Sequence, residues 1–336
     1  MSNKVVQKGD LILITGGTGW VGSHIAEKAL EQGLKVRLAV RNEARAQELI
    51  KGLKGKFGQS AHLETITVKD FDAENAYDEA VKGVQGIIHA ASTVTFSDQW
   101  EEVIPPTIRG YSALLNAAHV QGDAIKRVVL TSSSIAVARG SSEPDAVKQH
   151  VTVDTWNDQD VELAKKSPNP LFVYAASKVL SEKFAWDFVK EHKPSFVLNT
   201  VLPSLCAGEK VPGTNYQSTA AWLRSVVFDA NQDIADTFQS SYLVDTGDVG
   251  LLHVLAATRQ DIVNERILAF SEVFVWDQII DLAQKYAPEK FNSVKKTERT
   301  GAKTNVVADL SRTQEILKEF GGLKTLEETV RLNLQD

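Results

Sequence analysis

The chain has 336 residues, of which 43% are hydrophobic and 24% are charged, and this composition excludes a disordered chain. The formal net charge of −6 argues against a surface built for nucleic acid or for an anionic membrane. The one cysteine, Cys206, excludes an intramolecular disulfide. No apolar run reaches the roughly 18 residues of a membrane span, and the first ten residues lack a signal-peptide core. We therefore expect a soluble protein of the reducing cytoplasm.

Short apolar runs rich in β-branched residues alternate with longer helical stretches. The runs predict strands over residues 11–14, 35–40, 63–68, 86–89, 127–130 and 196–201. Near-continuous apolar runs are typical of parallel strands that are covered by helices on both faces. Between the first two runs, residues 20–31 carry apolar side chains spaced by four, which predicts a helix. The alternation indicates an α/β fold, a Rossmann-type doubly wound parallel sheet.

A glycine-rich turn follows the first predicted strand: Thr15-Gly-Gly-Thr-Gly-Trp-Val-Gly22. Glycines at 16, 19 and 22 allow a tight turn, a close approach of the backbone to a pyrophosphate, and close packing of helix on strand. The helix N-terminus offers unpaired N–H groups to the phosphates. A plain strand-to-helix turn is the alternative, but the place between first strand and first helix favours dinucleotide binding.

The end of the second predicted strand indicates which dinucleotide is bound. A carboxylate there would bind the adenosine ribose of NAD, whereas this chain has Arg41, then Arg45, and no acid before Glu43. Two guanidinium groups suit the 2′-phosphate of NADP. Two solvated surface arginines are the alternative. We expect NADP(H).

The fifth predicted strand ends in a run of hydroxyls, Thr131-Ser-Ser-Ser134. It lies at the carboxyl edge of the sheet, where such folds bind their ligands. A hydroxyl there can hydrogen-bond a substrate carbonyl, or the loop can satisfy its own backbone. Strand alternation places Ser133 opposite to Ser132 and Ser134, but does not say which of them faces the cofactor.

Tyr174 and Lys178 are four residues apart in a predicted helical stretch, so their side chains share one face. The ammonium can lower the pKa of the phenol and bind the nicotinamide ribose, while the phenol passes a proton to a carbonyl oxygen. The same spacing recurs at Tyr286 and Lys290. Pro288 disfavours a helix between that second pair, and we reject it.

After about Pro203 the pattern becomes irregular. Helices are predicted over 222–228 and 248–256, and capping boxes at Ser311–Gln314 and Thr325–Glu328 predict two more. The predicted layout is an NADP(H)-binding Rossmann domain over 1–203, to which 242–270 returns. A smaller, discontinuous substrate lobe is expected from 204–241 and 271–336.

The phrases Thr-Gly-Gly-Thr-Gly-Trp-Val-Gly, Leu-Thr-Ser-Ser and Tyr-Ala-Ala-Ser-Lys, in this order, resemble an extended short-chain dehydrogenase/reductase. Further phrases at 94–97, 184–186, 192–203 and 248–253 look like fungal NADPH-dependent aldehyde and ketone reductases. These are relatives of dihydroflavonol 4-reductase and cinnamoyl-CoA reductase. The resemblance covers about residues 10–330.

The resemblance implies a catalytic triad of Ser133, Tyr174 and Lys178. It also implies cofactor contacts along the glycine turn and at the strand ends: Gly16, Thr18, Gly19, Trp20, Val21, Gly22, Arg41, Arg45, Asp70, Phe71, Ala90, Ala91, Ser92, Tyr174, Lys178, Pro203 and Ser204. The candidate substrate walls, Phe96, Leu205 and Trp222, carry no charge. An asparagine of the wider superfamily is missing from the stretch Pro106-Thr-Ile-Arg-Gly110, so Thr107 or a water would have to relay the proton.

We therefore expect an NADPH-dependent carbonyl reductase for aldehydes and ketones, a monomer or homodimer. The histidines show no ligand spacing, and no metal is expected. A sugar-nucleotide epimerase or dehydratase is one alternative, but residues 205–245 lack the arginine cluster that a second diphosphate would require. The other alternative is a non-catalytic NADP-sensing regulator, which would not need the triad.

Overall fold

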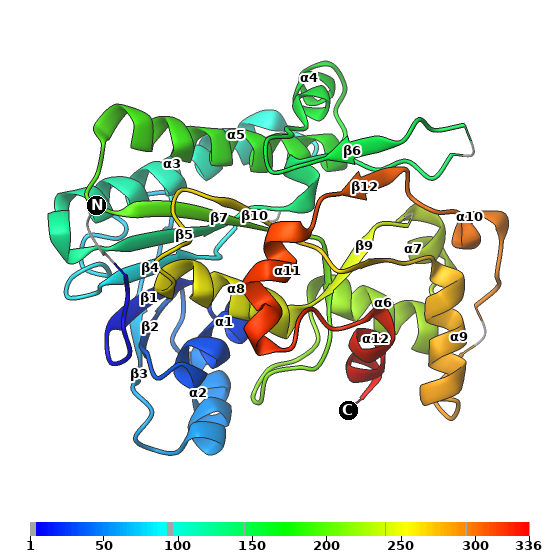
Figure 1. The fold of residues 1–336 in the computed structure, drawn as a ribbon, viewed down its shortest axis with the longest axis horizontal. Coiled ribbons are helices and arrows are strands. Elements are labelled where there is room, and N and C mark those ends of the chain that lie inside the picture. The colour runs from blue at the N-terminus through cyan, green and yellow to red at the C-terminus, as the bar shows by residue number, and fades with distance from the viewer. Residues whose placement is uncertain (1–4, 93–96, 144, 239, 293, 336) are drawn as a thin grey trace.

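A parallel seven-stranded sheet forms the middle of the molecule in the computed structural model (Figure 1). The structure describes residues 5–92, 97–143, 145–238, 240–292 and 294–335. The strands, in their order across the sheet, are β10 (Arg266–Ala269), β7 (Val197–Pro203), β5 (Arg127–Thr131), β4 (Gly86–His89), β1 (Leu11–Thr15), β2 (Lys35–Val40) and β3 (Leu63–Thr67). The predicted α/β class and the doubly wound parallel sheet are confirmed. The four-residue β10 was not predicted as a strand.

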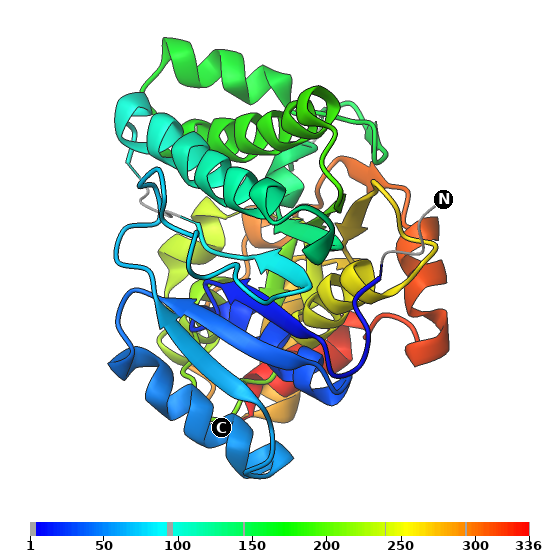
Figure 2. The ribbon, with the colours of Figure 1, turned by 90° about the vertical axis from the view of Figure 1, so that its left-hand side faces the viewer.

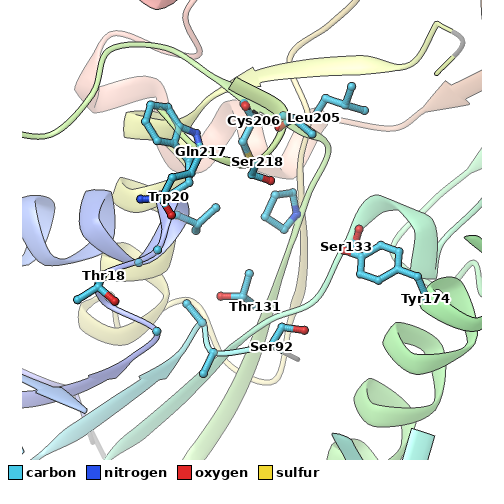
Figure 3. A pocket seen from close by; sticks show the side chains of 18 of the residues that line it. Thr18, Trp20, Ser92, Thr131, Ser133, Tyr174, Leu205, Cys206, Gln217 and Ser218 are labelled. Carbon is cyan, nitrogen blue, oxygen red and sulfur yellow. Dashed lines mark hydrogen bonds between the residues drawn. The ribbon is translucent and has the colours of Figure 1, made fainter. Parts of the chain in front are cut away.

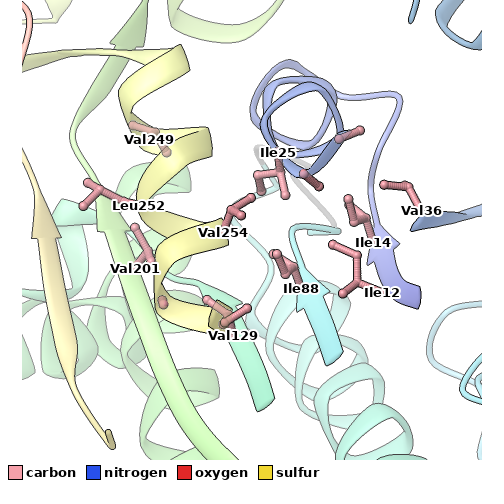
Figure 4. Packing of buried hydrophobic residues seen from close by; sticks show 14 of the residues in the cluster. Ile12, Ile14, Ile25, Val36, Ile88, Val129, Val201, Val249, Leu252 and Val254 are labelled. Carbon is pink, nitrogen blue, oxygen red and sulfur yellow. The ribbon is translucent and has the colours of Figure 1, made fainter. Parts of the chain in front are cut away.

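Helices cover the sheet on both faces (Figure 2). On one face lie α1 (Trp20–Glu31), α2 (Ala44–Phe57) and α8 (Thr246–Thr258), and on the other lie α3 (Trp100–Val120) and α5 (Pro170–His192). Figure 4 shows Ile25 of α1 and Val254 of α8 against the strand residues Ile14, Ile88 and Val129, all fully buried. Burial of each such side chain contributes about 1.5–3 kcal/mol. This packing fixes the N-terminus of α1, and with it the glycine turn.

A smaller sheet lies beside the carboxyl ends of the large one, in the order β11 (Glu272–Val273), β9 (Tyr242–Asp245) and β8 (Leu205–Ala207). Buried side chains join it to α6 (Ser218–Phe228), α7 (Gln232–Thr237), α9 (Trp276–Tyr286) and α12 (Leu326–Leu334). Residues 246–269 leave this region to form α8 and β10 on the large sheet, whereas β9 pairs within the small one.

The remaining elements are short. A parallel pair joins β6 (Gln149–Val151) to β12 (Val306–Ala308), and α4 (Asp158–Lys166), α10 (Glu298–Gly301) and α11 (Ser311–Leu317) complete the α-helices of the described ranges. Three 3₁₀ turns span Gly122–Ala124, Ser134–Ala136 and Lys318–Phe320. Within these ranges we find no helix with the length and apolar character needed to cross a membrane.

One of the two predicted capping boxes forms. At the start of α12, the Thr325 hydroxyl accepts the Glu328 N–H at 3.2 Å and the Glu328 carboxylate accepts the Thr325 N–H at 2.9 Å. The predicted box at Ser311 is wrong, because α11 begins at Ser311 itself. Its N–H is instead accepted by the Asp309 carboxylate at 3.0 Å.

Candidate active site

A cavity of about 1290 Å³ lies at the carboxyl ends of the large sheet's strands and is also lined by the segment after Pro203. Parallel sheets of this kind bind their ligands at this edge. The predicted site residues that line it are Gly16, Thr18, Gly19, Trp20, Val21, Gly22, Arg41, Arg45, Phe71, Ala90, Ala91, Ser92, Ser133, Tyr174, Lys178, Pro203, Ser204, Leu205 and Trp222. Asp70 is exposed outside this lining, and its carboxylate accepts the Asp72 N–H at 3.2 Å. Phe96 lies outside the described residues.

The glycine turn approaches its own helix so closely that no side chain fits. A Cβ added to Gly22 would lie 2.1 Å from the carbonyl oxygen of Gly16. Gly19 is the N-cap of α1 and brings no side-chain hydrogen bond to the first turn. The N–H groups of that turn are therefore available to an anion. A dinucleotide diphosphate fits this cradle.

Two arginines line the cavity where β2 passes into α2. The guanidinium carbon of Arg41 lies 5.2 Å from the centroid of the Phe71 ring. Arg41 and Arg45 are both exposed, and within the described ranges neither forms an ion pair with a carboxylate. Both charges are therefore free to hold a phosphate.

Ser133 and Tyr174 lie next to each other at the opposite end of the pocket from Thr18 and Trp20 (Figure 3). Helix α5 carries the tyrosine and starts at Pro170, where the Asn169 side chain caps it by accepting the Leu171 N–H at 2.9 Å. Pro at the first position suits a helix start because its missing N–H would have no partner there.

The electrostatics of the two residues on α5 are set by burial. Burial raises the pKa of the Tyr174 phenol above its usual value, and its hydrogen bond with Ser133 opposes this rise. Burial lowers the pKa of Lys178 to about 8, against the raising effect of Glu182. The Lys178 ammonium lies 5.9 Å from the centroid of the Tyr174 ring. Near neutral pH the site therefore holds a protonated phenol beside a charged amine.

Hydrogen bonds show which way Ser132 and Ser133 point, which strand alternation alone did not decide. Ser133 contacts Tyr174, whereas the Ser132 hydroxyl donates to the Glu182 carboxylate at 2.6 Å. Of these two serines, Ser133 is thus the one beside the tyrosine.

Two further polar side chains near the site are neutral. His89 at the end of β4 is fully buried, burial lowers its pKa to about 3, and its ring is hydrogen-bonded to Thr15 at 2.8 Å. Burial raises the pKa of Cys206 to about 12, and its thiol donates to the Ser204 carbonyl at 3.4 Å. Near neutral pH neither side chain brings a charge to the site.

The candidate for the proton relay is engaged elsewhere. The Thr107 hydroxyl donates to the Val103 carbonyl at 2.6 Å, one turn back in α3, and Thr107 does not line the cavity. The described residues contain no group of three or more His, Cys, Asp and Glu side chains that could hold a metal ion.

The sequence did not mark several lining residues, among them Arg139, Leu171, Phe238 and all of the segment 213–219 except Tyr216. That segment reaches the cavity because the chain crosses α2 at Gly52, where an added Cβ would lie 2.1 Å from the Pro212 carbonyl oxygen. A glycine in the middle of a helix is unfavourable without such a reason. Gly52 was therefore the sequence feature that could have indicated a close approach of another segment to α2.

The second Tyr–Lys pair has a different setting. Tyr286 is the last residue of α9, so Lys290 lies beyond the helix. Tyr286 donates its hydroxyl hydrogen to Glu327 on the surface, and neither residue of the pair lines the cavity.

Comparisons with known proteins identify the family and the fold. The model of the NAD dependent epimerase/dehydratase family matches residues 12–261. The chain is 36% identical over 86% of its length to the Aspergillus terreus protein named NAD-dependent epimerase/dehydratase terH, and covers 86% of that protein. It is 32% identical to Aldehyde reductase 2 of Sporidiobolus salmonicolor, over 98% of this chain and 97% of that one. Yeast methylglyoxal/isovaleraldehyde reductase Gre2 complexed with NADPH has the same fold, with a TM-score of 0.80 over 96% of both chains at 20% identity.

Proposed function

The chain belongs to the NAD dependent epimerase/dehydratase family of extended short-chain dehydrogenases/reductases, and from that membership we propose that it reduces aldehydes and ketones to alcohols with Tyr174 as general acid. It is an oxidoreductase that uses NADP(H). One observation carries the proposal: Ser133, Tyr174 and Lys178 line one end of a cavity whose other part holds the glycine turn and the two free arginines.

The residues present fit NADP(H) along the cavity. The N–H groups at the start of α1 would hold the diphosphate, Arg41 and Arg45 the 2′-phosphate, and Lys178 the nicotinamide ribose. When bound, the cofactor supplies a hydride to the substrate.

The chain itself handles the proton. The hydroxyls of Ser133 and Tyr174 converge where a carbonyl oxygen would bind and can both donate to it. Tyr174 releases its proton as negative charge develops on that oxygen. The Lys178 ammonium, one turn along α5, stabilises the phenolate that remains.

The walls beyond the triad support a bulky, mostly apolar substrate. Leu205, Trp222 and Phe238 are uncharged. Arg139 also lines the cavity, but its Nε donates to the buried Asp160 carboxylate at 2.9 Å. Arg224 donates to the Asn333 carbonyl at 2.7 Å, outside the lining. The diphosphate of a nucleotide sugar would therefore lack counter-charges here.

The test is turnover with NADPH, followed by its absorbance, on a panel of aldehydes, β-ketoesters, α-chloroketones and nucleotide sugars. We expect oxidation of NADPH with the carbonyl compounds and none with the nucleotide sugars. Binding of NADPH without turnover of any carbonyl compound would contradict the proposal and favour a sensor. Conversion of nucleotide sugars instead would favour an epimerase or dehydratase.

A further inference from the structure

Glu182 is a buried carboxylate that ties the triad's helix to three neighbouring strands. It lies on α5 and is 1% exposed. It accepts hydrogen bonds from Ser132 at the end of β5 (2.6 Å), from Thr200 of β7 (2.7 Å) and from Arg266 of β10 (2.8 Å). One side chain therefore sets the distance between α5 and the strand end that carries Ser133.

A packing role alone would not require a charge at this place. Removing a carboxylate and a guanidinium from water is unfavourable for each group, and apolar residues of similar volume often replace buried ion pairs without loss of stability. The side chains of Glu182 and Arg266 are only 1% and 8% exposed. A buried charge kept in these surroundings points to a use in the nearby site.

That use is indicated by what surrounds Lys178, which is itself 5% exposed. From β4 it faces His89, which burial keeps neutral by lowering its pKa to about 3. Tyr111 of α3 lies against His89, with ring centroids 5.0 Å apart, and burial raises the pKa of this phenol. On α5 itself it faces Tyr174, which is also protonated near neutral pH. Glu182, one turn further along α5, is thus the anion that faces the ammonium.

Two other groups complete this environment. Cys206 of β8 lies beside Tyr174 and is a protonated thiol. Arg266 pairs with Glu182 and is anchored on its other side, because it donates to the Thr155 carbonyl at 2.9 Å and lies 3.7 Å from the centroid of a Trp156 ring. Arg266 partly neutralises the charge of Glu182 towards Lys178, but it also holds the carboxylate in place.

We propose that Glu182 is a positioning residue of this enzyme: its carboxylate holds α5 at the strand ends and keeps Lys178 in its charged form. This rests on the role that the proposed function gives to Lys178, as the amine that binds the nicotinamide ribose and stabilises the phenolate.

The test measures NADPH affinity against pH by fluorescence, which needs no carbonyl substrate. In the unmodified protein, affinity should fall as the pH rises through about 8, because Lys178 loses its proton there. Lys178→Ala should abolish this fall in affinity, which is the alkaline limb of the pH profile. Glu182→Gln keeps the shape of the side chain but removes its charge, so the limb should move down by about half a pH unit or more. Glu182→Asp keeps the charge and should return the limb towards its original position.

Two further variants separate charge from structure. Glu182→Gln alone leaves the buried Arg266 unpaired and can destabilise the fold, so the double variant Glu182→Gln/Arg266→Gln provides a neutral pair. Its limb should move in the same direction but by less, because loss of the positive charge of Arg266 partly offsets loss of the carboxylate. Thr200→Val removes one hydrogen bond to the same carboxylate but keeps its charge, and should lower Tm while leaving the limb in place. A limb unmoved in a folded Glu182→Gln or double variant, or moved equally by Thr200→Val, would overturn the proposal. Failure of the unmodified protein to reduce carbonyl compounds would instead contradict the proposed function, and would leave this pH shift measurable.

Discussion

Tyr174 is the side chain on which the proposed proton transfer depends. Tyr174→Phe removes only the hydroxyl, so NADPH affinity should stay nearly constant while kcat falls at least about 100-fold, the effect of losing a general acid. Steady-state kinetics and a cofactor titration measure the two quantities. Tyr286→Phe is the matched control, because that phenol lies on the surface against Glu327. If the Tyr174→Phe protein were active and the Tyr286→Phe protein inactive, the assignment of the active site would be wrong.

The arginine at the end of β2 should decide between the two nicotinamide cofactors. Arg41 lines the cavity without a carboxylate partner among the described residues. A charge-assisted hydrogen bond contributes about 1.5–3 kcal/mol, so Arg41→Gln should weaken NADPH binding roughly 10- to 100-fold and change NADH binding little. Arg109→Gln is the control, because Arg109 pairs with Asp72 outside the cavity. Equal efficiency of both cofactors in the unmodified protein would refute the preference.

At the scale of residues, the sequence predicts best what depends on neighbours in the chain. The spacing of Tyr174 and Lys178 follows from the helical period. Whether Ser132 or Ser133 faces the tyrosine does not, because alternation fixes relative but not absolute direction. The role of Glu182 could not be predicted either, because its partner Arg266 is 84 residues away along the chain.

At the scale of elements, residues 208–217 form a segment that crosses α2 and lines part of the cavity. We call it the crossing segment. It is tied to α1 by a hydrogen bond between the His24 ring and the Glu209 carbonyl at 2.8 Å. Where it crosses α2, Gly213 has φ +84°, and an added Cβ would lie 2.0 Å from the Glu48 carbonyl oxygen. The segment can therefore cross here only with a glycine.

Gly213→Ala should displace the crossing segment from α2. Strain in the left-handed region alone costs about 1–3 kcal/mol, and the overlap with Glu48 adds to it, so we expect a lower Tm together with weaker NADPH binding. Gly321→Ala is the matched control: its φ is +92°, but an added Cβ would meet no atom within 4 Å. That variant should lose stability and keep its NADPH affinity. A Gly213→Ala protein with unchanged NADPH affinity would show that the segment does not shape the cofactor site.

Elements with a clear period were predicted well, and those without one were not. Six of the parallel strands were marked by their apolar runs, whereas the short apolar run of β10, which follows a loop in the less regular part of the chain, was not recognised. The predicted box at Ser311 placed the start of α11 one residue too late, because Ser311 is already helical and its own N–H donates to the Asp309 carboxylate. The sequence therefore held a second polar side chain, Asp309, that could bind the helix start. Competition of this kind is decided by backbone conformation, which local sequence does not specify.

At the scale of the whole molecule, the arrangement after Pro203 depends on contacts between distant residues. Lys324 near the C-terminus donates to the carboxylates of Asp245 at 2.8 Å and of Asp248 at 2.6 Å. The pairing of β12 with β6 likewise joins residues more than 150 positions apart. No periodicity marks such pairs, so the sequence indicated the parallel sheet and the cofactor turn but not which side chains face the triad from the other side.

The substrate pocket is made by these long-range contacts, and Trp222 tests it. Trp222 of α6 stacks on Phe238, with ring centroids 4.3 Å apart, and both line the cavity. Each methylene of a substrate is worth about 1–3 kcal/mol in an apolar pocket, so shape decides which face of a ketone meets the hydride. Trp222→Ala should change KM and the enantiomeric ratio for aryl ketones while leaving NADPH affinity unchanged, as measured by chiral product analysis and cofactor titration. Phe320→Ala, at an aromatic that is 44% exposed and outside the lining, should change neither. Unchanged selectivity across several aryl ketones would remove Trp222 from the pocket, because an apolar wall of that size cannot be lost without altering the fit of a bulky substrate.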